Sequence, residues 1–296
     1  MSGSIRAGVG IIVGTLACMS LHAQLFSATG SLERVARPDG APATISEACM
    51  RLRGTIHTSV ILIDIRDSSF LIPIAGNTPG NNGTYFKSDV IIANYRSVDQ
   101  RIGVGWMAAS VDNTHGPLMY FNIPARTTVA QDDFVATALG KSGLGAILVF
   151  GVDSLGSNDA AASLDGFSRI WTLQPGSLGS VSQTFDAVSL TDSIGSLTAN
   201  IVGLKQSSDF RTNVGIVNLD QVSHTWTMRS IQTGVLTKVL VPPYSVVQSA
   251  LAGGSASVAG NVALTVNSDG FGFWWSAYGT SVDNRTGDGW VARAKQ

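Results

Sequence analysis

Charged side chains are scarce in this chain of 296 residues. Only 13% of the residues are charged, about half of the share that is usual for globular proteins. The 19 Lys and Arg nearly balance the 20 Asp and Glu, and no basic stripe is present. The sequence therefore lacks the electrostatic attraction with which proteins bind nucleic acids or anionic membranes, and we expect neither as a partner.

Cysteine and metal-ligand motifs are also scarce. If the chain is cleaved after Ala23, Cys18 is lost, and Cys49 alone cannot form an internal disulfide. We expect Cys49 to be a small, partly buried apolar residue, with a disulfide between two chains as the alternative. No histidine pair has zinc-site spacing, and no Gly-x-Ser-x-Gly elbow is present. The sequence predicts no cofactor, no metal centre and no catalytic site, so an enzyme is not expected.

Residues 1–23 have the pattern of an export signal. Arg6 precedes an uncharged apolar run from Ala7 to Leu21, and Leu21-His22-Ala23 offers a cleavage site before Gln24. The alternatives are an uncleaved anchor, for which fifteen apolar residues are short, and a lipoprotein-type cleavage at Cys18. We expect an exported protein, periplasmic or extracellular, with no membrane span in the mature chain.

One strand pattern occurs twice. Residues 86–94 read FKSDVIIAN and residues 210–218 read FRTNVGIVN, which are 124 residues apart. Five recurring positions (Phe86, Ser88, Val90, Ile92 and Asn94 in the first copy) share one face of a β-strand, because side chains alternate along strands. The copies therefore share an inward-facing surface. A repeat of this length predicts two copies of one small all-β unit.

Other blocks recur at shorter spacings. Residues 123–125 match 241–243 at a spacing of 118, and 146–149 match 263–266 at 117. Residues 165–167 match 269–271 at 104, which gives the first copy a loop 13 residues longer and pairs Trp171 with Trp275. We place an export signal at 1–23, a linker with a short helix at 24–55, and β-sandwich domains at 56–186 and 187–296.

Three local features refine these boundaries. Thr44-Ile45-Ser46-Glu47 has the spacing of a helix capping box, and Gly54 is expected to end the helix. The β-branched run Thr58–Ile65 predicts a strand. Pro73 in the next apolar strand indicates an edge position.

The run from Gly203 to Asn218 resembles the opening of an immunoglobulin-like β-sandwich repeat found in secreted and surface proteins of environmental bacteria. The run from Ser281 to Asp288 is similar to the closing hairpin of such repeats, and the first copy lacks that string. This resemblance covers residues 68–296. It implies two tandem antiparallel sandwiches and an accessory or display role, and it carries over no functional residues.

Aromatic residues near the C-terminus are the candidates for ligand binding. In FGFWWSAY (271–278), both faces of a strand carry aromatic side chains, and Trp275 is assigned to the core. This leaves Trp274, Tyr278 and the nearby Trp290 as rings that could stack on sugars. The competing interpretation is that a loop, the linker or the other domain covers them.

Acidic residues in two loops are weak candidates for calcium ligands. Calcium needs six to eight oxygen ligands that converge on one point, and neither loop has EF-hand spacing. Asp and Asn are also common turn formers, which is the competing interpretation. The candidates are Asp153, Asp159, Asp283 and Asp288, with Asn158, Asp165 and Asn284 beside them.

The sequence thus predicts a non-catalytic, exported structural or adhesive protein. Its expected partner is a protein or a cell-surface polymer. The alternative function is a carbohydrate-binding module that uses Trp274, Tyr278 and Trp290. The structural interpretation further predicts an apolar contact between two rigid domains, without a cleft of converging ionisable groups.

Overall fold

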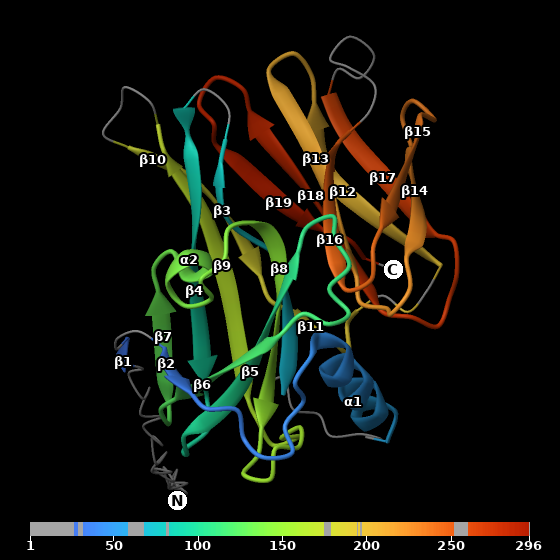
Figure 1. Ribbon diagram of the computed structural model, residues 1–296. Coiled ribbons are helices and arrows are strands. Elements are labelled where there is room, and N and C mark those ends of the chain that lie inside the picture. The colour runs from blue at the N-terminus through green and yellow to red at the C-terminus, as the bar shows by residue number, and fades with distance from the viewer. Residues whose placement is uncertain are drawn as a thin grey trace, which may run out of the picture.

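A computed structural model describes residues 27–28, 32–58, 68–80, 83–174, 179–193, 195, 197–251 and 260–295 (Figure 1). The chain is predominantly β, with several antiparallel sheets. Within these residues no helix is long and apolar enough to cross a membrane. The predicted export signal, and the predicted strand beyond Thr58, lie outside the described residues.

The N-terminal segment contributes two short strands and one helix. The strands are β1 (Ser27–Ala28) and β2 (Glu33–Val35), and the helix is α1 (Ile45–Thr58). The Glu47 amide donates to Thr44 Oγ1 at 3.3 Å, and Glu47 Oε2 accepts from the Ala43 amide at 2.7 Å, so the capping interactions form. The prediction that Gly54 ends the helix is wrong, because the helix continues to Thr58.

The first repeat, as we call residues 69–186, has two groups of four strands. β3–β8–β5–β6 form one group and β7–β4–β9–β10 the other, and they join where β3 meets β4. A short helix, α2 (Phe134–Thr137), follows β7. The strands are β3 (Ser69–Pro79), β4 (Tyr85–Asn94), β5 (Gln100–Ala108), β6 (Leu118–Ile123), β7 (Thr127–Gln131), β8 (Gly143–Val152), β9 (Leu164–Leu173) and β10 (Ser180–Asp186).

The second repeat, residues 198–293, has the same strand order. Its sheets are β12–β17–β14–β15 and β16–β13–β18–β19. Between the repeats, β11 (Val188–Ser189) pairs back with β3. The strands are β12 (Thr198–Gln206), β13 (Phe210–Asn218), β14 (His224–Ser230), β15 (Leu236–Val241), β16 (Ser245–Ala250), β17 (Gly260–Ser268), β18 (Trp275–Asp283) and β19 (Gly289–Arg293).

The strand registers confirm three of the spacings in the sequence. β4 and β13 occupy the same place, so Asn94 and Asn218 correspond at a spacing of 124, and their strand partners Thr127 and Ser245 are 118 residues apart. Both repeats have a bulge in the first strand, after Ile72 in β3 and after Ile201 in β12. Ile72 pairs with Ile147 and Ile201 pairs with Leu264, and these two partners are 117 residues apart. Pro73 lies within the first bulge, where its missing N–H costs no ladder bond, and this explains its place in the strand.

The fourth spacing is wrong. Asn94 pairs with Leu164, and Asn218 pairs with Trp275. Leu164 and Trp275 are therefore equivalent at a spacing of 111, and Trp171 does not correspond to Trp275. The loop of the first repeat is six residues longer than its counterpart, not thirteen. Residues 269–271 precede the strand in the second repeat, so their match to 165–167 was a match between a loop and a strand.

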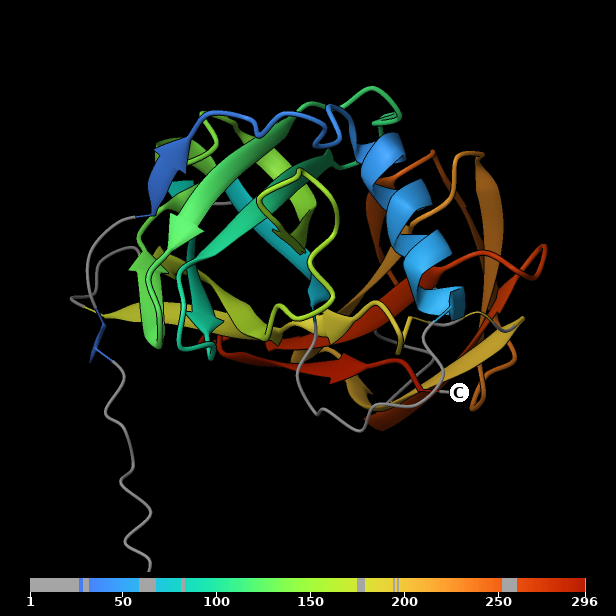
Figure 2. The same cartoon turned by 90° about the horizontal axis from the view of Figure 1, so that it is seen from below.

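Three apolar clusters hold the chain together. One lies inside the first repeat and includes Ile92 and Ile102, and another lies inside the second and includes Ile216 and Trp226. The third cluster, which we call the shared core, joins α1 to the outer faces of both repeats. Figure 2 shows α1 lying beside both halves of the molecule. The residues of the shared core include Cys49, Leu52, Leu148, Phe150, Phe185, Val217, Tyr244, Val246 and Tyr278.

A polar seam runs beside the shared core. The Ser110 amide donates to the Val246 carbonyl at 3.0 Å, and Asn113 Nδ2 donates to the Tyr244 carbonyl at 3.0 Å. In return, Ser245 Oγ donates to the Ala108 carbonyl at 2.9 Å. The loop after β5 therefore pairs with the edge of β16, and this fixes the second repeat against the first.

Candidate functional site

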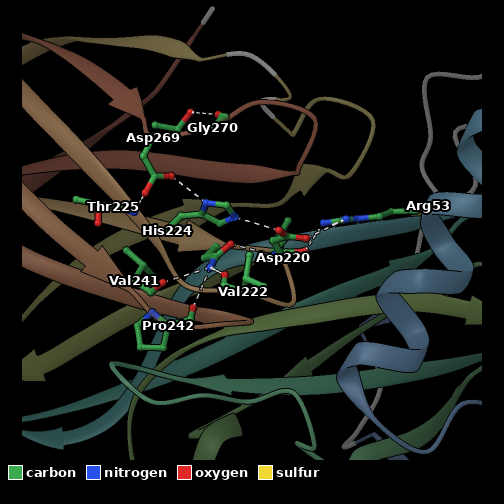
Figure 3. Close-up of polar contacts among 12 residues, drawn as sticks. Arg53, Asp220, Val222, His224, Thr225, Val241, Pro242, Asp269 and Gly270 are labelled. Atoms are coloured by element: carbon green, nitrogen blue, oxygen red, sulfur yellow. Dashed lines mark hydrogen bonds and ion pairs between the residues drawn. The ribbon is translucent and has the colours of Figure 1, made fainter.

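A group of linked ionisable side chains lies at the end of the second repeat that faces α1 (Figure 3). The loops that carry this group are held by Asn218, the last residue of β13, which is fully buried. Asn218 Nδ2 donates to the carbonyls of Val222, Val241 and Pro242 at 2.8–3.3 Å, and its Oδ1 accepts from the Asp220 amide. This one side chain fixes the loop after β13 and the turn after β15.

Directly after this loop, at the start of β14, His224 lies between two carboxylates. His224 Nε2 is 3.0 Å from Asp220 Oδ2, and His224 Nδ1 is 2.9 Å from Asp269 Oδ1. Both ring nitrogens can donate at once only when the ring is protonated. The ring also stacks on Phe273, with centroids 3.7 Å apart and planes 11° apart.

Helix α1 reaches the same group through Arg53. Arg53 Nη1 is 3.1 Å from Asp220 Oδ1, and Nη2 donates to the Leu219 carbonyl at 2.7 Å. The guanidinium also lies over the Trp274 ring, 5.5 Å from its centroid. Burial alone would raise the pKa of Asp220, but the hydrogen bond from His224 and the charge of Arg53 outweigh it and hold that pKa below its usual value.

The arrangement does not fit nucleophilic catalysis. In a catalytic triad, one imidazole nitrogen bonds a carboxylate and the other accepts the proton of a nucleophile. Here the second imidazole nitrogen is bonded to Asp269 Oδ1, and Asp269 Oδ2 accepts from the Thr225 amide at 2.7 Å. A histidine between two carboxylates can bind elements together, but it has no nitrogen left for a substrate.

The first repeat has a different set of side chains in the same place. Arg96 and Gln100 correspond to Asp220 and His224, each 124 residues earlier. Arg96 Nη1 is 2.7 Å from Gln100 Oε1 and 2.6 Å from Asp159 Oδ2, and Asp159 lies in the loop that corresponds to that of Asp269. Asn94 repeats the bonds of Asn218, donating to Val98, Ile123 and Pro124. The two repeats thus use different side chains at equivalent positions to link the same two loops.

The three aromatic candidates do not share an exposed face. Tyr278 is 2% exposed, lies in the shared core and contacts Phe185 edge-on at 5.3 Å. Trp274 is partly buried against the same core, beneath Arg53. Trp290 is 39% exposed but lies on β19, where its Nε1 donates to the Gly203 carbonyl. The first repeat therefore covers Tyr278, and α1 covers Trp274. This burial matches the competing interpretation for two of the three rings.

The acidic candidates serve local turns or ion pairs. Asp153 Oδ1 accepts from the amides of Leu155 and Ser157, and Asp283 Oδ1 accepts from those of Arg285 and Thr286. These amides hold the pKa of Asp283 below its usual value. Asp159 pairs with Arg96, and the Asp288 carbonyl closes the turn to the Asp283 amide. The described residues contain no group of three or more His, Cys, Asp or Glu that could hold a metal ion.

Sequence reasoning missed the His224 group. The sequence pattern around His224 gives no sign of it, because Arg53 and Asp269 lie far from His224 in the chain. One signal was present: the recurring Asn94 and Asn218 mark the loops where these groups form. No protein-family model, no curated protein and no solved structure matches this chain.

Proposed function

We propose that this chain is an exported, non-catalytic structural or adhesive protein, built from two immunoglobulin-like β-sandwiches, that acts through contacts with other proteins. The observation that carries this proposal is the shared core. Leu52, Tyr244 and Tyr278 are buried in it, and it unites α1 with the outer faces of both repeats. A large apolar contact of this kind favours one rigid body over two independently moving domains.

The ionic group beside the shared core supports the same conclusion. Arg53, Asp220, His224 and Asp269 connect α1 with two loops of the second repeat, and each partner's charge is used internally. Such a group positions elements and leaves no ionisable side chain directed at a substrate. A rigid body with internally satisfied charges suits a spacer or a display module.

Export is supported by the apolar N-terminal run after Arg6. Cys49 is buried, and burial raises the pKa of its thiol to about 12, so the thiol is protected from oxidation. The carbohydrate-binding alternative needs Trp274 and Tyr278 together on an open face, and the burial of Tyr278 removes its main support.

Export and contact are tested in cells that naturally produce the chain. Fractionation followed by N-terminal analysis should find the protein outside the cytoplasm with Gln24 as its first residue. Amine cross-linking of intact cells should then give discrete adducts larger than the chain. Retention in the cytoplasm would contradict export, and failure to form adducts at every cross-linker length would contradict a contact function.

A further inference from the structure

The outer edge of β15 is an open sheet edge on the second repeat. β15 pairs with β14 on one side, and no other described strand pairs with it. Leu236 and Leu240 project from this strand and are 59% and 63% exposed, with the exposed Lys238 between them. Figure 1 shows β15 at the margin of the molecule, away from the first repeat. Unpaired backbone groups beside exposed leucines can accept a further strand.

The first repeat shows what this edge binds when it is covered. Its equivalent strand is β6, where Tyr120 and Asn122 correspond to Lys238 and Leu240. The N-terminal segment runs along β6, since β2 pairs antiparallel with residues 120–122. Farther along, the Leu118 amide donates to the Ala43 carbonyl at 3.2 Å. One repeat therefore has an added strand exactly where the other has none among the described residues.

The described residues offer no second segment of this kind for β15. The residues that precede the second repeat form β11, which pairs with β3 of the first repeat. The edge of β12 is covered by Lys295, which exchanges two backbone hydrogen bonds with Asn200, and the edge of β16 is covered by the loop containing Ser110. Of these three edges, β15 alone has no backbone partner beyond its own sheet among the described residues, and the fourth terminal strand, β19, lies beside β10 of the first repeat.

The charges around the edge define the partner. β14 and β15 carry Arg229 and Lys238 and no acidic residue, and Arg229 lies opposite Leu236. In the register of β2 on β6, Glu33 lies opposite Asn122, the counterpart of Leu240. A carboxylate at that place on an added strand would be the diagonal neighbour of Lys238, within reach of its long side chain.

We propose that the edge of β15 binds an extended strand of a partner protein, antiparallel to β15, as β2 binds β6. Main-chain hydrogen bonds would supply affinity, and alternate side chains would supply specificity. The partner strand would place apolar side chains beside Leu236 and Leu240 and a carboxylate beside Lys238. This inference rests on the proposed contact function, for which it names the surface and the class of partner.

Lys238 has a second possible use, because lysines on edge strands also prevent indiscriminate strand pairing. Here it stands between two exposed leucines, so it discourages basic or neutral strands and admits acidic ones.

The test uses the purified full chain and a fluorescent peptide with the sequence of residues 30–44, measured by anisotropy. We expect saturable binding that Lys238→Glu weakens about threefold, the size of one cross-strand charge pair. The peptide variant Glu33→Lys should reverse this preference and bind the Lys238→Glu chain better than the unaltered chain. Lys141→Glu is the matched control, because Lys141 is exposed in a loop of the first repeat and the substitution makes the same charge change, so it should leave binding unchanged.

Three results would overturn the proposal. The first is no saturable binding, and the second is binding that is indifferent to Lys238→Glu, as expected if the peptide displaced β2 from β6. The third is self-association of the chain that Lys238→Glu abolishes, which would make a second copy the occupant. If the peptide fails to bind while cross-linked adducts still form in cells, the contact function stands and only this surface is refuted.

Discussion

At the scale of single residues, two buried asparagines have the same structural task. Asn218 closes a loop and a turn in the second repeat, and Asn94 does so in the first. Asn218→Ala removes the side-chain amide that donates to the carbonyls of Val222, Val241 and Pro242. Because these carbonyls lose a hydrogen bond in a buried place, we expect a loss of about 2 kcal/mol in the free energy of unfolding. Urea unfolding of the full chain measures this loss.

The control for Asn218→Ala is Asn200→Ala. Asn200 is exposed, and its side chain accepts one hydrogen bond from Thr265 Oγ1 at 3.2 Å. Its replacement should change the free energy of unfolding by no more than about 0.5 kcal/mol. Equal effects of the two substitutions would show that Asn218 does not fix the loops.

The ionic group around Asp220 makes stability depend on acid pH. The folded-state pKa of Asp220 is lowered, so its ionised form stabilises the fold above the unfolded-state value near 4, and this contribution is lost as the pH falls through the folded-state pKa. The gap in unfolding free energy between the unaltered chain and Asp220→Asn should therefore be widest above pH ~4 and close below it. Denaturant titrations from pH 6 to pH 2 test this, and parallel curves would refute it.

At the scale of elements, glycines in strands make room for aromatic rings on the neighbouring strand. Gly215 of β13 pairs with Tyr278 of β18, and a Cβ at Gly215 would lie 2.1 Å from the Tyr278 ring. Because Tyr278 is packed in the shared core, the ring cannot move freely. Gly215→Ala should destabilise the fold by about 1–3 kcal/mol. Thermal unfolding of the variant measures the effect.

Gly54 of α1 is the matched comparison for Gly215. A Cβ there meets no heavy atom within 4 Å. Because alanine restricts the unfolded chain and suits a helix, Gly54→Ala should stabilise the fold by about 0.5–1 kcal/mol. If both substitutions shifted the melting temperature in the same direction, the contact between Gly215 and Tyr278 would not be the cause.

Elements that repeat a buried pattern were predictable from sequence, and elements that follow loops were not. The match of 86–94 to 210–218 reflects an inward face that packing constrains, and the registers confirm it. The match of 165–167 to 269–271 failed because loop residues at 269–271 are free of that constraint. Thr44 and Glu47 correctly marked the start of α1, whereas Gly54 did not end it, since packing of the helix outweighs the low propensity of one glycine.

At the scale of the whole molecule, the sequence indicated two copies but could not indicate how they meet. The aromatic residues on both faces of 271–278 left open whether one face was exposed or covered by another part of the chain. Only the structure identifies this cover as α1 and the first repeat, because contacts between distant segments leave no periodic trace in the sequence. The His224 group was hidden for the same reason, since its members come from α1 and two separate loops.

Because α1 and both repeats share one core, the described chain should unfold as a single cooperative unit. Calorimetry of the full chain should give one transition with equal calorimetric and van't Hoff enthalpies.

Leu52 is buried in the shared core, and Leu52→Asp places a charge there without altering the core of either repeat. This change should separate the unfolding into two transitions. Met50→Asp, at an exposed position of the same helix, should keep one transition. Two transitions in the unaltered chain would mean that the repeats are energetically independent, and the rigid body behind the proposed function would be lost.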